Sequence, residues 1–133
     1  MERKIINPAK WQDAFGFVQG QQVTGAQSVL FCAGQVSIDP EGKLLHVGDY
    51  RGQLNCVLDN IEKVLHAVGV TFDNVYEIRT VIGNATDFGA LNDIFRERMP
   101  NRGFVGHGYV TEFLASGMKI EVEAEAYLPE FDS

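Results

Sequence analysis

Cysteine and long apolar runs are scarce in this chain of 133 residues, and each scarcity argues against a class of protein. The two cysteines, Cys32 and Cys56, form no CxxC or zinc-type spacing, so the sequence indicates no metal motif. No apolar run approaches the roughly 18–20 residues that a membrane-spanning helix needs. The charged N-terminal segment also lacks the apolar stretch of a signal peptide. We therefore expect a soluble, cytoplasmic protein without a membrane partner.

Positive charge is also in short supply. Lys and Arg number 11 against 18 Asp and Glu, which gives a formal net charge of −7. A nucleic-acid-binding surface needs a clustered basic footprint, so we expect no nucleic-acid partner. The histidines His46, His66 and His107 lie far apart, without HxH or HxxxH spacing. We therefore expect no bound metal and no cofactor.

The chain does have enough apolar material for one core. With 45% hydrophobic residues, a chain of this length can bury a core of its own. No low-complexity linker, short repeat or abrupt change of composition divides it. We expect a single domain over residues 1–133.

The hydrophobic pattern predicts strands, helix, strand, helix and strands, in that order. Apolar residues at spacings of three and four predict a helix from Arg51 to Val68, and Gly69 suits its C-terminal end. A second helix is expected to begin at Thr86 or Asp87 and to end before Pro100. The predicted strands are 2–6, 15–23, 28–34 and 75–82, followed by a hairpin of 109–114 with 118–127.

The last predicted strand alternates strictly between apolar and charged side chains. One of its faces can pack on a core, whereas the other carries three carboxylates that burial would penalise. In the strand 75–82 we assign Glu77 and Arg79 to the same charged face, where Arg79 can pair with glutamates across the sheet. We assign Tyr76, Ile78 and Ile82 to the apolar face. The charged face of the last strand carries Lys119, Glu121, Glu123 and Glu125, and its apolar face carries Ile120, Val122, Ala124 and Ala126.

Two helices can cover only one face of a mixed sheet of five or six strands. The sequence therefore predicts an α+β fold with two helices packed on one face of the sheet. The uncovered face, with its mixed charges, suits the interior of a closed oligomer.

Several segments, taken in this order, resemble one family. Residues 30–42 combine an apolar strand, Gly-Gln-Val and an Asp-Pro turn. The first helix contains Leu-Asp-Asn-Ile at 58–61 and Ala-Val-Gly at 67–69, and residues 119–124 read Lys-Ile-Glu-Val-Glu-Ala. Together with Asp-Phe at 87–88, these segments resemble the reactive-intermediate deaminases, the Rid or YjgF-like family, over about residues 15–128.

The resemblance implies a chorismate-mutase-like α+β fold and a homotrimer. In such trimers the sheets line the centre, and three equivalent clefts form between subunits. Family members with established chemistry hydrolyse enamines and imines such as 2-aminoacrylate or 2-iminopropionate without a cofactor, and they release ammonia.

The resemblance also shows where this chain departs from its family. The arginine that holds the substrate carboxylate falls on Gly106, and the positions after it are His107 and Gly108. Only a guanidinium offers the planar fork for bidentate binding. The nearest arginine is Arg102, four residues earlier. Standard deamination of 2-aminoacrylate or 2-iminopropionate is therefore not expected.

Other site positions follow from the same resemblance. Phe17 replaces a tyrosine and Ala33 replaces a serine, so two hydroxyl groups are lost, whereas Asn92 and Glu121 are retained. Glu121 is the position that activates or orients the attacking water. We therefore predict Glu121 as the catalytic residue, with substrate binding at Phe17, Ala33, Asn92, Arg102, Gly106, His107 and Gly108.

Each of these residues also has a plainer structural interpretation. Glu121 is equally well explained as a charge paired with an arginine across the sheet or between subunits. His107, between two glycines, is favoured as a ligand contact over a solvated loop histidine. Arg102 is favoured as a solvated loop residue over a substitute clamp.

Three functions remain open from the sequence. The leading hypothesis is a homotrimer that binds a small metabolite at subunit interfaces and hydrolyses an imine, enamine or related C–N bond. The alternative is a non-catalytic small-molecule-binding or regulatory trimer. A ribonuclease or translation inhibitor is the weakest hypothesis because of the acidic charge.

Overall fold

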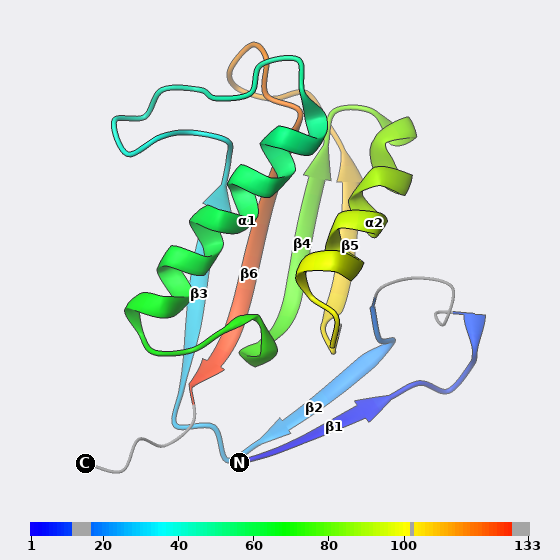
Figure 1. The fold of residues 1–133 in the computed structure, drawn as a ribbon. Coiled ribbons are helices and arrows are strands. Elements are labelled where there is room, and N and C mark those ends of the chain that lie inside the picture. The colour runs from blue at the N-terminus through cyan, green and yellow to red at the C-terminus, as the bar shows by residue number, and fades with distance from the viewer. Residues whose placement is uncertain (12–16, 102, 129–133) are drawn as a thin grey trace.

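The computed structural model describes residues 1–11, 17–101 and 103–128 and shows an α+β domain (Figure 1). Two helices pack on one face of a four-stranded sheet with strand order β3-β6-β4-β5. The predicted fold class is confirmed, although the strands are divided between this sheet and a separate two-stranded one. The elements are β1 (Glu2–Ile6), β2 (Gly20–Thr24), β3 (Ser28–Gln35), α1 (Tyr50–Ala67), β4 (Val75–Ile82), α2 (Phe88–Arg98), β5 (Val105–Val110) and β6 (Ile120–Leu128), with short 3-10 turns at Phe72–Asn74 and Ala85–Asp87.

Helix α1 lies where the apolar periodicity predicts it, within one residue at each end. Its first turn is capped by Asp49, whose side chain accepts a hydrogen bond from the Gly52 backbone N–H at 3.0 Å. After its last turn the chain reverses at Gly69, which has φ 78°. Its inward stripe is fully buried and consists of Leu54, Val57, Leu58, Ile61 and Leu65.

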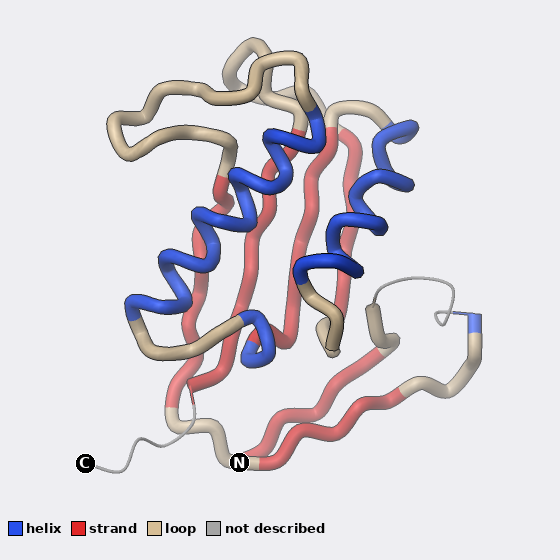
Figure 2. The backbone as a smooth tube through the Cα atoms, in the orientation of Figure 1, coloured by secondary structure: helices blue, strands red, loops and turns tan. Residues whose placement is uncertain are grey.

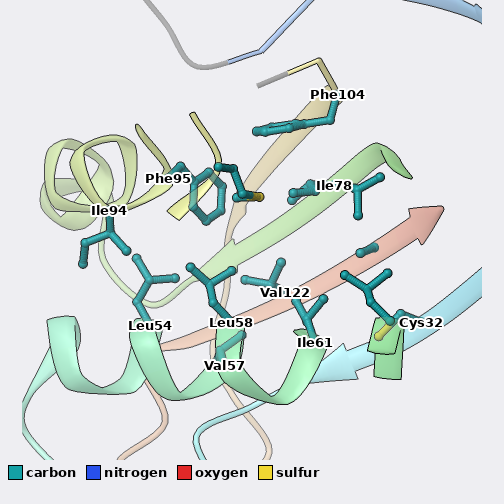
Figure 3. Packing of buried hydrophobic residues seen from close by; sticks show 14 of the residues in the cluster. Cys32, Leu54, Val57, Leu58, Ile61, Ile78, Ile94, Phe95, Phe104 and Val122 are labelled. Carbon is teal, nitrogen blue, oxygen red and sulfur yellow. The ribbon is translucent and has the colours of Figure 1, made fainter. Parts of the chain in front are cut away.

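Strand β6 forms the centre of the molecule, between β3 and β4. Its apolar face is buried against the helices, and its glutamates alternate on the other face, as predicted. Figure 3 shows Val122 of β6 next to Leu58 and Ile61 of α1, and Ile78 of β4 near Phe104. The core therefore lies between the sheet and the two helices.

The predicted hairpin of 109–114 with 118–127 is wrong. Strand β5 instead runs parallel to β4, with Ile78 paired to Gly106 and Ile82 to Val110. Helix α2 forms the crossover between these two parallel strands, as parallel pairing requires. The turn signal around Gly117 is real, since Gly117 has φ 90°, but it ends a long loop that carries the chain from the edge of the sheet to its centre.

Tyr76 was also assigned to the wrong face. The register of β4 against β6 moves from Val75–Ala126 to Glu77–Glu125, so Tyr76 is an extra residue in a β-bulge. The bulge turns Tyr76 outward, and its hydroxyl donates to Glu125 Oε2 at 2.7 Å. One inserted residue thus reverses the alternation that the sequence suggests.

The β1–β2 hairpin lies apart from the larger sheet (Figure 2). Arg3 on β1 attaches it to the rest of the domain: Nη1 donates to the Asp73 carbonyl at 2.7 Å, and Nη2 donates to the Val75 carbonyl at 3.2 Å and to that of Gly103. The β2 strand begins at Gly20, so the predicted strand 15–23 starts too early. Residues 17–19 are irregular apart from an isolated bridge of Val18 to Val105, and residues 15–16 lie outside the described part of the chain.

Candidate functional site

A pocket of about 240 Å³ lies between helix α2 and the edge strand β5. Helix α2 supplies one wall, β4 and β5 supply the floor, and Phe17 closes one side. Its lining residues are Phe17, Ile78, Thr80, Phe88, Leu91, Asn92, Phe95, Phe104, Gly106, His107 and Gly108.

Two glycines create this space. Gly106 and Gly108 pair with Ile78 and Thr80, which are buried on the helix-covered face of the sheet. Residues paired across a ladder share a face of the sheet, so side chains at positions 106 and 108 would point toward α2. A Cβ atom built on Gly108 would meet nothing within 4 Å, whereas one on Gly106 would lie 3.3 Å from Phe17 Cβ. The missing side chains therefore leave room for a ligand.

The lining is aromatic and has few polar groups. Four of its residues are phenylalanines, and Phe95 and Phe104 meet edge to face with ring centroids 6.0 Å apart. Thr80 and Asn92 supply the polar side chains on this side of the sheet, and the described lining contains no lysine or arginine. His107 also borders the pocket, but it pairs with Arg79, so its imidazole lies on the open face. The pocket can therefore hold an apolar group and orient one polar group beside it.

Glu121 lies on the opposite face of the sheet. It pairs with Val81, one residue out of step with the inward-facing Thr80 and Ile82. Its carboxylate packs against the backbone of Gly34, so closely that a Cβ atom at Gly34 would clash with Oε1. Within one chain, Glu121 therefore does not reach the pocket between α2 and β5.

The open face also holds a cluster of charges around Arg79. The guanidinium contacts Glu77 at 2.6 Å, Glu123 at 2.9 Å and Glu125 at 3.2 Å. The cross-strand pairing of Arg79 with glutamates is thus confirmed. The hydrogen bond to Glu123, joined by those to Glu77 and Glu125, raises the pKa of Arg79 despite the opposing effect of burial. The guanidinium therefore stays charged, and it offsets only part of the negative charge around it.

His107 connects the pocket with this cluster. It pairs with Arg79 in the β5–β4 ladder, and its Nε2 lies 3.5 Å from Glu77 Oε1. Burial and the hydrogen bond to Glu125 raise the pKa of the neighbouring Tyr76, so its hydroxyl remains a donor. His107 thus stands at the strand edge, where the pocket meets the open face.

The structure brings together some of the predicted site residues and separates others. Phe17, Asn92, Gly106, His107 and Gly108 line the same pocket. Glu121 and Ala33 do not line it; Ala33 is exposed, in the bulged part of β3. Arg102 lies outside the described residues.

Sequence reasoning missed much of the pocket wall, because its members were assigned to the core or to no site at all. The alternating glycines of β5 are the signal that could have revealed them, since glycine inside a strand often marks close approach of a ligand. The missed lining residues are Ile78, Thr80, Phe88, Leu91, Phe95 and Phe104.

No group of three or more His, Cys, Asp or Glu side chains within residues 1–11, 17–101 and 103–128 is arranged to hold a metal ion. Among the helices in these ranges, none combines the length and the apolar character needed to cross a bilayer.

The half-covered sheet, the crossover helix and the charged open face define a chorismate-mutase-like α+β domain. A family comparison agrees with this class: residues 13–128 match the Endoribonuclease L-PSP family. The chain therefore belongs to this family, which is the Rid or YjgF-like family that its motifs resemble.

Individual relatives span nearly the same length. A RutC family protein of Pyrococcus horikoshii is 30% identical over 106 residues, covering 80% of this chain and 84% of the relative. The 2-iminobutanoate/2-iminopropanoate deaminase of Mus musculus is 29% identical over 125 residues, covering 93% and 90%. A Rid-family protein of unknown function from Yersinia pestis superposes with a TM-score of 0.86 at 27% identity, covering 96% of this chain and all of that structure.

Proposed function

We propose that this protein is a cofactor-independent hydrolase of imines, enamines or related C–N bonds that works as a homotrimer, with its sites between subunits. The observation that carries the proposal is a ligand-sized pocket, on the scaffold of a family that includes imine deaminases, with a carboxylate retained at Glu121. The separation of Glu121 from the pocket supports a site shared between copies.

A second copy would complete the site. The pocket opens beside the edge strand β5, and Glu121 stands on the open face of the sheet. Phe31, which pairs with Glu125 on that same face, is 72% exposed. An exposed phenylalanine among charged groups on an uncovered sheet favours burial against another subunit. In the proposed trimer, the open face of one subunit brings Glu121 to the pocket of the next.

The proposed reaction is the addition of water to a C=N bond. Glu121 accepts a proton from the water as its oxygen bonds to the imine carbon. Glu121 then returns this proton to the nitrogen, which gives a carbinolamine. The carbinolamine forms the C=O bond as the C–N bond breaks, and its hydroxyl proton leaves with the nitrogen, so one imine and one water give one carbonyl compound and one ammonia. Thr80 and Asn92, whose side chains line the pocket, can hydrogen-bond the reacting group and orient it.

2-Iminopropionate is proposed to be a poor substrate. Each charge-assisted hydrogen bond to its carboxylate is worth on the order of 1.5–3 kcal/mol. Glycine at position 106 removes two such bonds, which corresponds to a roughly hundredfold to ten-thousandfold loss of affinity for the substrate carboxylate. A non-catalytic small-molecule-binding trimer is the second candidate, favoured by the lack of a cation in the described lining. Ribonuclease activity is disfavoured by the net charge of −7.

Ammonia release from a panel of imines, generated in place by an amine or amino-acid oxidase, tests the proposal. We expect turnover of some imines, and we expect 2-iminopropionate to have the lowest kcat/KM in the panel. We also expect Glu121→Gln to lower kcat by at least about a hundredfold, as for a general base. Glu112→Gln, at an exposed loop position, is the matched control and should be unchanged.

Three results would contradict the proposal or its details. If no imine is turned over faster than in buffer, the non-catalytic candidate replaces the hydrolase. Full activity in Glu121→Gln would remove Glu121 from the mechanism. If 2-iminopropionate is hydrolysed at the rate of its relatives, Arg102→Ala shows whether Arg102 serves as the clamp. Gly106→Arg combined with Phe17→Ala, which relieves the 3.3 Å contact, should raise activity on 2-iminopropionate.

A further inference from the structure

We infer that the pocket between α2 and β5 selects neutral ligands with an aromatic ring and excludes small carboxylates. This inference rests on the proposed function in one respect, because it names the substrate class of the same pocket. The ring would lie over Gly106 and Gly108, and its polar substituent would face Thr80 and Asn92.

The size of the pocket fits one ring with a short substituent. Its volume is about 240 Å³, and an apolar cavity of about 150 Å³ already accepts benzene. A second hollow of about 340 Å³ adjoins it and shares Thr80, Phe88, Leu91 and Gly108. It continues along the strand past Ile82 and Val110. A substituted ring therefore has room to extend along β5.

The walls favour a ring over an aliphatic chain. Phenylalanines stand on three elements or loops around the space: Phe17 before β2, Phe88 and Phe95 on α2, and Phe104 just before β5. Figure 3 shows Phe95 and Phe104 at one end of the core, close to Ile78. A bound ring can meet such rings edge to face, the arrangement that Phe95 and Phe104 already adopt.

The same walls disfavour a carboxylate. A carboxylate moved out of water needs a cation or several donors to compensate for lost hydration. The described lining offers the side chains of Asn92 and Thr80 but no lysine or arginine. A carboxylate there would keep no compensating charge, whereas a neutral amide, imine or carbonyl group needs only the hydrogen bonds that these two side chains can make.

Calorimetric titration with three probes tests this inference without any turnover. Benzamide carries the ring and a neutral planar polar group, acetamide lacks the ring, and benzoate replaces the amide by a carboxylate. We expect the Kd of benzamide to be at least about tenfold lower than that of either other probe. Benzoate binding equal to or tighter than benzamide binding would overturn the inference. If Arg102→Ala then abolished that binding, Arg102 would be the cation that attracts carboxylates.

Filling the pocket tests the location. Gly108→Leu places a side chain where nothing lies within 4 Å of the new Cβ, and we expect it to raise the Kd of benzamide at least about tenfold. Gly89→Leu is the matched control, because its Cβ also meets nothing within 4 Å but lies on α2 away from the pocket. Gly108→Ala should have a smaller effect in the same direction, which keeps the test usable if the leucine variant fails to fold. Unchanged benzamide binding in both Gly108 variants would overturn the inference.

The outcomes separate this inference from the proposed function. Benzamide binding in this pocket without ammonia release from any imine would leave the ligand class standing and overturn the hydrolase. Imine hydrolysis without preferential benzamide binding would support the hydrolase and overturn the inferred ligand class.

Discussion

At the scale of single residues, Arg79 has the largest electrostatic role on the open face. It contacts three carboxylates at once, and its side chain keeps 33% of its surface exposed. In an isolated exposed pair such contacts contribute little, but a cation shared by three carboxylates prevents their mutual repulsion. The stability of the open face therefore depends on a single guanidinium within the described cluster.

We expect Arg79→Met to lower the free energy of unfolding by about 1–3 kcal/mol, between the values for exposed and buried ion pairs. The cost arises because Glu77, Glu123 and Glu125 lose their shared partner. Urea unfolding at fixed protein concentration measures the difference.

Arg51→Met is the control for this experiment. Arg51 contacts Asp93 at 3.7 Å, and their side chains are 61% and 65% exposed. Its loss should change stability by less than about 0.5 kcal/mol. Equal effects of the two variants would show that the Arg79 cluster is only a surface contact.

The residues also show where sequence reasoning about the site succeeds. Gly106 and His107 were found through a resemblance, because a family motif assigns positions along the chain. Phe88 and Phe95 were missed, because an apolar helix position has the same pattern whether it packs on a neighbour or lines a pocket. Glu121 was assigned to the site, but its face of the sheet separates it from Gly106 within one chain.

At the scale of elements, Gln53 joins parts of the chain that lie far apart in sequence. It is fully buried on α1. Its amide nitrogen donates to the carbonyls of His46 at 3.1 Å and Gly117 at 2.8 Å, and its oxygen accepts from the Lys119 N–H at 2.9 Å. One amide thus holds the loop before α1 and the loop before β6 against the helix.

We expect Gln53→Leu to lower the free energy of unfolding by about 2–4 kcal/mol. The leucine fills a similar volume but leaves two carbonyls and one N–H without their partner, and unpaired buried groups are costly. Lys63→Leu, at an exposed position of the same helix, should change stability by less than about 0.5 kcal/mol. Thermal and urea unfolding measure the difference. A loss below about 1 kcal/mol in Gln53→Leu would mean that water replaces the amide.

Elements were predicted well where the pattern is local. The bounds of β4 were predicted at both ends, and α1 was displaced by one residue. The wrong predictions for β5 and Tyr76 have one cause: both features depend on pairing between segments that are distant in the sequence. Strand β5 pairs with β4 across α2, which no turn signal between 110 and 119 can reveal. The bulge at Tyr76 depends on the register against β6, so the alternation of residues 75–82 alone could not indicate it.

At the scale of the whole molecule, the proposed homotrimer makes a direct prediction. Light scattering should give three times the 14.7 kDa subunit mass. Phe31→Asp should shift the protein toward monomers, because it removes an exposed ring and places another carboxylate opposite Glu125 on the open face. Circular dichroism of the variant should remain that of the folded subunit.

Val47→Asp is the matched control, since Val47 is 66% exposed but lies in the loop before α1. It should leave the assembly unchanged. A wild-type protein that is monomeric over a wide concentration range would refute the trimer and the shared site together. Dissociation of both variants would show that the interface is not confined to the open face of the sheet.

The central position of β6 has a consequence for how the protein is made. Its neighbour β3 comes much earlier in the chain: Ser28 pairs with Leu128, one hundred residues later. In the described part of the chain, β6 is the strand that connects β3 to β4. During synthesis, α1 and the β4–α2–β5 unit leave the ribosome before the strand that joins them to β3. The apolar face of α1 therefore stays incompletely covered until translation has passed Leu128, and nascent chains need protection from aggregation over that interval.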